Sequence, residues 1–187
     1  MLVRLFERVK VWIARHLFHG ARIKLVAHWS WDHYRDGKLI DQWEYNNFCS
    51  NEGLNHMLDT TFHDKANISP WYVEIFESDT TPDADTTYAV PVYTPSDAYD
   101  EATRPEYEEA AASSKVTTNT ANKAVFTISA TKTIYGAALV GGGSAATTPK
   151  DVAGGGTLFS ASKFAAAKSV VDDDVLNVTI EITLADS

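Results

Sequence analysis

The sequence of 187 residues contains a single cysteine, Cys49, so no disulfide can form within the chain. A lone thiol is typical of a reducing compartment, and we expect Cys49 to be a small buried apolar residue. No stretch reaches the roughly 18 to 20 apolar residues that a membrane-spanning helix requires. The first 19 residues do not read as a secretory signal, because charged residues interrupt any apolar run. We therefore expect a cytosolic setting and no membrane span.

Patterns that mark active sites are also missing. Residues 141–144 lack the Gly-Lys-Ser/Thr ending of a phosphate-binding loop, and neither a nucleophile elbow nor an HExxH motif occurs. Among the six histidines, His28 with His33 and His56 with His63 could each form a pair, but neither pair has the set of carboxylates or cysteines of a typical metal site. Residues 172–174 are three aspartates that could ligate calcium, but a turn before the last strand is the favoured interpretation. We predict no enzyme activity, no cofactor and no metal site.

Charge is distributed unevenly along a chain whose net charge is −9. Residues 1–40 carry a net charge of +5, whereas the remaining 147 residues carry −14. The content of 44% hydrophobic and 22% charged residues is that of a globular protein, and the length fits one domain with an arm. The basic residues at the start are interspersed with apolar ones, so nucleic acid is not an expected partner. This polarity favours an assembly component over a catalyst.

Residues 2–18 have the spacing of an amphipathic helix that ends near Gly20. Its apolar stripe must pack against the chain's own body, a partner surface or a lipid surface, and the sequence leaves these three open. We call residues 1–20 the N-terminal arm and residues 21–187 the body. The candidate capsid- or partner-binding residues of the arm are the apolar Leu2, Leu5, Phe6, Val9, Trp12 and Ile13 and the basic Arg4, Arg8 and Arg15.

Beyond Gly20 the apolar period changes to two, which is typical of strands. Residues 23–31 and 39–45 flank Asp36-Gly37, a dipeptide suited to a type I′ turn, so we predict a β-hairpin. A short helix follows, with Ser50 or Asn51 as N-cap and Leu54, Met57 and Leu58 on one face. Further strands are expected at residues 71–76, 124–130, 133–140, 157–161 and 175–184, in an antiparallel sheet with one wet face. Residues 141–156 are expected to form a mobile loop.

A long acidic stretch, residues 77–110, contains four prolines that keep it out of regular structure. Loops of this size are usually functional or held by a partner. Arg104 is its only base, and Pro105 follows. We interpret Arg104 as a pin that holds the loop and include it among the candidate partner-binding residues. An exposed surface base is the alternative.

Four tryptophans, Trp29, Trp31, Trp43 and Trp71, lie on the predicted strands. They could form a platform on which bases or sugars stack. Aromatic residues that alternate along hairpin strands are more often core residues or cross-strand pairs, which is the interpretation we favour.

A set of short segments beyond residue 35 occurs in a fixed order along the chain: Asp36-Gly37-Lys38, Asn51-Glu52-Gly53-Leu54-Asn55 with Leu58, Trp71-Tyr72-Val73, Glu101-Ala102-Thr103-Arg104-Pro105, Val125-Phe126-Thr127-Ile128, Gly136, Gly156-Thr157-Leu158-Phe159 and Asp174-Val175-Leu176. This ordered set resembles a family of small structural proteins of tailed bacteriophages, the head decoration or cement proteins. The family has glycine before the aspartate that opens the last strand, where this chain has Asp173, and the N-terminal arm has no counterpart that we can match.

The resemblance implies a mainly β protein, with an antiparallel β-sandwich or jelly-roll-like body that binds the outer surface of an assembled capsid and stabilises it. The implied partners are the major capsid protein and further copies of the chain. The implied location is the exterior of a virion assembled in the host bacterial cytoplasm, and no catalysis is implied. The first alternative is a receptor- or glycan-binding module of a phage head or tail fibre. The second is a small hydrolase or lyase on a jelly-roll scaffold.

Overall fold

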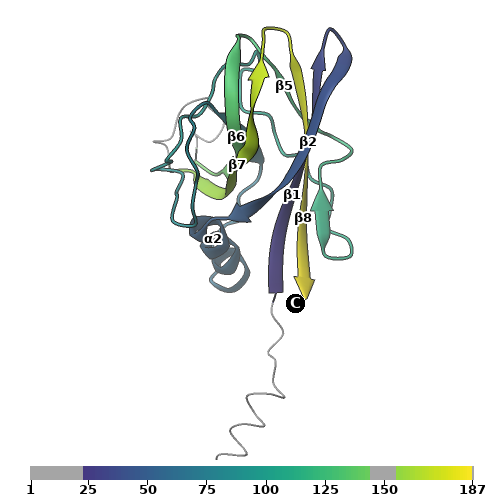
Figure 1. The fold of residues 1–187 in the computed structure, drawn as a ribbon. Helices are drawn as coiled ribbons and strands as arrows, with labels where there is room; N and C mark the ends of the chain where they lie inside the picture. The colour runs from purple at the N-terminus through teal and green to yellow at the C-terminus, as the bar shows by residue number, and fades with distance from the viewer. Residues whose placement is uncertain (1–22, 144–154, 187) are drawn as a thin grey trace, which may run out of the picture.

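The computed structural model describes residues 23–143 and 155–186, which form a curled antiparallel sheet and one helix (Figure 1). The strands follow the order β3-β6-β7-β2-β1-β8-β4, and β5 also pairs with β8. The predicted mainly β class is confirmed. The N-terminal arm and residues 144–154 of the predicted mobile loop lie outside the described residues. The elements are β1 (Ile23–Arg35), β2 (Lys38–Cys49), α2 (Asn51–Phe62), β3 (Trp71–Phe76), β4 (Val116–Thr118), β5 (Ala124–Thr127), β6 (Lys132–Gly141), β7 (Thr157–Val170) and β8 (Val175–Asp186).

The first two strands form the predicted hairpin. Asp36 and Gly37 have φ values of 50° and 70°, as a type I′ turn requires. Trp31 pairs with Trp43 across the hairpin, and their rings stack with centroids 5.5 Å apart. Trp29 and Trp31 are only 0% and 1% exposed, so the interpretation of these two tryptophans as core residues is confirmed.

The sheet consists of two halves that β2 joins. Strand β2 pairs with β1 from Lys38 to Asn47, and it then pairs with β7 through Phe48 and Cys49 alone. The core lies where side chains of the two halves meet. The rings of Trp31 and of Phe164, from the other half, pack edge to face with their centroids 5.4 Å apart. Cys49 is half-buried against this core, and burial raises the pKa of its thiol to about 12.

Helix α2 begins as predicted but buries a different face. Ser50 is the N-cap, and its hydroxyl accepts a hydrogen bond from the backbone N–H of Gly53. The buried residues of the helix are Gly53 and His56, whereas Leu54 and Leu58 are exposed. A Cβ atom on Gly53 would lie 2.5 Å from the backbone oxygen of Phe159, so the helix approaches β7 through this glycine. The buried face follows from that close approach.

The remaining predicted strands occur at the predicted positions, but some of them differ in length from the prediction. Strand β3 has the predicted bounds, and β5, β6 and β8 begin within one residue of the predicted starts. Strand β7 continues nine residues beyond the predicted end at residue 161, through three alanines that are weak strand formers. Strand β4 was not predicted, because three residues are too few for alternation to be recognised.

The acidic residues 77–110 form neither strand nor helix, as predicted, and they cover the outer edge of β3. The N–H groups of Val73 and Tyr107 donate to the carbonyls of Pro105 and Trp71 at 2.8 Å. The N–H of Ser96 donates to the carbonyl of Ile75, also at 2.8 Å. The loop therefore satisfies an edge strand that would otherwise expose a row of unpaired backbone groups.

Candidate functional site

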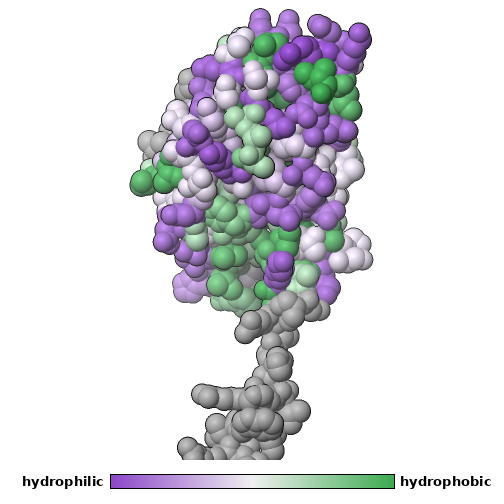
Figure 2. Space-filling view, in the orientation of Figure 1, coloured by the Kyte–Doolittle hydropathy of each residue, from purple (hydrophilic) through white to green (hydrophobic). Residues whose placement is uncertain are grey.

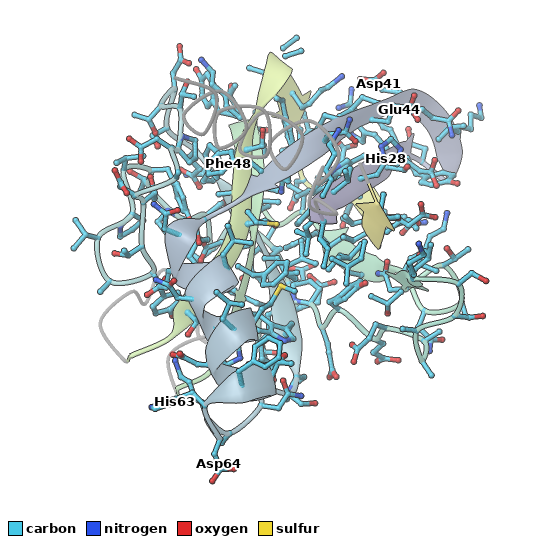
Figure 3. All side chains as sticks on the ribbon, turned by 90° about the horizontal axis from the view of Figure 1, so that it is seen from below. His28, Asp41, Glu44, Phe48, His63 and Asp64 are labelled. Carbon is cyan, nitrogen blue, oxygen red and sulfur yellow. The ribbon has the colours of Figure 1, made fainter. Side chains whose placement is uncertain are left out.

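An apolar groove opens at the end of the body where β1 begins and β8 ends, and its volume is about 450 Å³. The groove exists because β2 does not pair with the first four residues of β1. Pairing between β1 and β2 reaches only to Ala27, so residues 23–26 pair with β8 alone. Figure 3 views this end directly and shows β2 crossing away toward α2, with Phe48 near the crossing. Strand β2 therefore does not cover this end of β1, because its last residues pair with β7 and connect the two halves of the sheet.

Apolar side chains line the groove almost completely. Figure 2 shows apolar surface gathered over the lower part of the body, at this open end. Ile23 is 74% exposed although it lies on a strand. The charged groups at the groove are those of Glu109 and Lys115. The apolar lining includes Ile23 and Leu25 of β1, Met57 of α2, Val116 of β4, and Ile182 and Leu184 of β8.

A second apolar feature adjoins the groove on α2. Leu54, Leu58 and Phe62 recur every four residues on one helix face and are 38%, 56% and 81% exposed. Met57, which lines the groove, is the chain neighbour of Leu58. We call the groove and this helix face together the apolar end. Exposed apolar patches larger than scattered single side chains are typical of interaction sites, so the apolar end is the candidate site.

Exposed carboxylates occur in the part of the acidic loop that reaches the groove. Glu106, Glu108 and Glu109 are exposed, and Glu109 reaches the groove itself. They belong to the acidic loop, whose other end carries the exposed Asp83 and Asp85. A partner segment that combines apolar and basic residues therefore matches both the groove and its surroundings.

Arg104 lies inside the body, where it holds the acidic loop against β3. Its guanidinium pairs with the Glu74 carboxylate and donates to the Tyr88 hydroxyl at 3.3 Å. Arg104 and Glu74 are 1% and 2% exposed. Burial raises the pKa of Glu74, and the charge of Arg104 and a hydrogen bond from Tyr93 offset part of that rise. The interpretation of Arg104 as a pin is confirmed, and the alternative of an exposed base is wrong.

Asp174 forms a second buried polar cluster, between β7 and β8. Its carboxylate accepts bonds from Arg35 Nε at 2.8 Å and Nη2 at 2.7 Å, and from the N–H of Val171 at 2.8 Å. His33 Nε2 lies 2.8 Å from the same carboxylate. Burial would raise the pKa of Asp174, but these hydrogen bonds outweigh burial and hold it well below the usual value. The predicted turn at residues 172–174 is confirmed, with Asp173 at a φ of 66°.

Most of the predicted site residues belong to the arm, which precedes the groove residue Ile23 in the sequence. The nine candidate residues of the arm, from Leu2 to Arg15, lie outside the described residues. The arm ends at Gly20, three residues before Ile23, which lines the groove. Arg104 is buried away from the surface, so a direct contact of its side chain with a partner stays a prediction that this conformation does not favour.

Sequence reasoning did not find the groove. Alternation along residues 175–184 puts Ile182 and Leu184 on the same face as Leu176, Val178 and Ile180, and only the latter three are buried. The alternation alone does not show where along a strand the covering layer ends. The one local signal that could have indicated the groove is the apolar Ile23, which directly follows the basic N-terminal segment.

Within residues 23–143 and 155–186, no three His, Cys, Asp or Glu side chains converge to hold a metal ion. No helix in this part of the chain is long and apolar enough to cross a bilayer. No known family model matches the chain, and a search of curated proteins finds no similar sequence.

Proposed function

We propose that this chain is a virion structural protein that binds the outer surface of an assembled phage capsid and stabilises it. The observation that carries this proposal is the apolar end, which is exposed. The sequence that precedes it predicts a further apolar stripe in residues 2–18. A chain that keeps such surface uncovered gains free energy when a partner covers it. The resemblance to decoration proteins supplies the partner, the major capsid protein.

The physical role of such a protein is to add contact area across seams between capsid subunits. If it binds the expanded lattice more tightly than the unexpanded one, it stabilises the expanded state by mass action. A rigid body suits this role, because little ordering entropy is then lost on binding. Further copies of the chain would occupy equivalent lattice positions on the outside of the virion, after assembly in the host cytoplasm.

We further propose that the body is a β-sandwich or jelly-roll-like fold in a curled form. The support is the narrow connection between its halves, where β2 pairs with β7 through only Phe48 and Cys49. The side chains of β1 and β8 face those of β6 and β7 across one core. Two layers that face each other across one core are what a β-sandwich requires, and this supports the proposal.

The described structure offers no observation that favours the glycan-binding alternative. A sugar platform needs exposed aromatic faces, whereas Trp29 and Trp31 are buried. Trp43 is half-buried, and the ammonium of Lys168 lies 4.3 Å from its ring centroid. These rings are already in contact with the protein itself.

The test compares binding to two capsid states of the phage that encodes the chain. Mature capsids and procapsids are prepared from particles that lack this protein, and the purified full chain is added and co-sedimented. We expect saturable binding to mature capsids and little to procapsids. Equal binding to both, or binding to neither, contradicts the proposal. A glycan array with the same preparation tests the alternative.

A further inference from the structure

We propose that in the free protein the apolar stripe of residues 2–18 docks into the groove of the same chain, with its basic residues turned outward. This assigns an occupant to the groove, namely the chain's own amphipathic segment. The inference concerns the protein before it meets any partner. If the groove is also a capsid contact, the segment must leave it on binding, whereas the exposed helix face of Leu54, Leu58 and Phe62 stays available in either state.

The chemistry of groove and segment is matched. The groove is lined by apolar side chains of β1, β4, β8 and α2, and it lies open at one side. The segment presents Leu5, Phe6, Val9 and Ile13 at helical spacing on one face. Its arginines lie mostly off that face, and the groove carries one exposed carboxylate, Glu109, and one base, Lys115. Docking thus buries the apolar residues and leaves the arginines on the solvent side, where Glu109 is an available carboxylate.

The length and position of the segment allow this docking. The described chain starts at Ile23, which is itself part of the groove wall. A helix over residues 2–18 is about 25 Å long, at 1.5 Å per residue. The four residues between it and Ile23, among them Gly20, span up to about 14 Å and suffice to reverse the chain. The segment can therefore lie back over the groove and toward α2.

Tethering favours the chain's own segment over other occupants. A short linker holds the segment at an effective concentration of the order of millimolar near the groove. A segment from a second copy reaches that concentration only in a concentrated solution. A lipid surface would compete for the stripe, but it is absent from the free protein in buffer. The same-chain complex is thus the state expected on dilution.

The test is disulfide trapping in the full chain. In a Cys49→Ala background, Leu184→Cys in the groove is combined in turn with Leu5→Cys, Val9→Cys or Ile13→Cys, so that one register brings two thiols together. The matched control replaces the groove cysteine by Lys38→Cys, at the hairpin tip beyond the other end of β1. Met57→Cys serves as a second groove position, and circular dichroism checks that each variant is folded.

We expect at least one arm position to form an intrachain disulfide, in a yield about tenfold above the control. The yield should stay constant over about a hundredfold dilution, because a tethered reaction does not depend on protein concentration. Disulfide-linked dimers that disappear on dilution would overturn the proposal in favour of a second copy. Yields equal to the control at both groove positions would overturn it as well. Adding anionic vesicles to the same variants then tests whether the stripe instead binds lipid.

Discussion

The side of the body that residues 77–110 cover differs from the open end in the kind of side chains it carries. The covered side is fixed by buried polar groups, with Arg104 on Glu74 and loop backbone bonded to the edge of β3. The open end has almost no polar groups and exposes Ile23, Leu58 and Phe62. Buried polar pairs fix one geometry, since a misplaced partner leaves an unpaired buried charge. An apolar surface has no such requirement and can accept a partner, which is why we propose the open end, and not the covered side, as the binding region.

The largest expected effect is the loss of the Arg104 pin. Arg104→Ala leaves the Glu74 carboxylate buried without its cation, so the free energy of unfolding should fall by about 3–5 kcal/mol. Urea unfolding followed by tryptophan fluorescence measures this. The matched variant combines Arg104→Met with Glu74→Gln, which removes both charges and keeps an acceptor for Tyr93. It should recover most of the loss, and a cost below about 1 kcal/mol for the single variant would contradict the pin.

A somewhat smaller loss is expected at Asp174. Asp174→Asn removes the charge that Arg35 and His33 contact, and the free energy of unfolding should fall by about 2–3 kcal/mol. The folded pKa of Asp174 is lowered, so the stabilisation is complete above the unfolded pKa of about 4 and is lost as the pH falls toward the folded value. Unfolding free energies across that acidic range should therefore depend less on pH in Asp174→Asn. An unchanged slope would show that other carboxylates dominate acid unfolding.

The contact of α2 with β7 gives the next effect. Gly53→Ala places a Cβ against the backbone of Phe159, and shifting the helix should cost about 1–3 kcal/mol despite the better helix propensity of alanine. Asn55→Ala, at an exposed position of the same helix, is the control and should change stability by less than about 0.5 kcal/mol. Thermal unfolding compares the two. If both variants behave alike, the close approach is not what holds the helix.

The smallest effect on stability is expected at the apolar end. Leu58→Gln combined with Phe62→Gln should leave the free energy of unfolding within about 0.5 kcal/mol of the original, because both side chains are exposed. Binding to mature capsids should weaken at least tenfold if the helix face is part of the contact, which corresponds to about 1.4 kcal/mol. A strong loss of stability would mean that this face belongs to the core.

The residues that carry the resemblance to decoration proteins turn out to hold the body together. The Glu52 carboxylate accepts bonds from the N–H groups of Tyr88 at 2.9 Å and Leu158 at 2.7 Å. A Cβ on Gly136 would meet the ring of Phe76 at 2.1 Å. Asp173, where the family has glycine, adopts the positive φ that glycine favours and aspartate tolerates. In this chain these residues have structural roles, so partner-binding residues must be sought elsewhere.

Local chemistry explains which elements could be predicted from the sequence. The hairpin followed from Asp36-Gly37 and the helix start from Ser50, because both signals act over a few residues. The buried face of α2 depends on the approach of Gly53 to Phe159, about a hundred residues away, which no local pattern contains. The groove depends on where β2 leaves β1, a property of pairing. Arg104 could be identified as a pin, but its partner Glu74 could not.

The most direct test of the account is the orientation of the body on the particle, from a cryo-EM map of the mature capsid. The account predicts that the apolar end, with Ile23 and α2, faces the capsid shell, and that the Asp36–Gly37 hairpin tip points outward. The map would contradict the account if the hairpin tip faced the shell and the apolar end lay free in solvent.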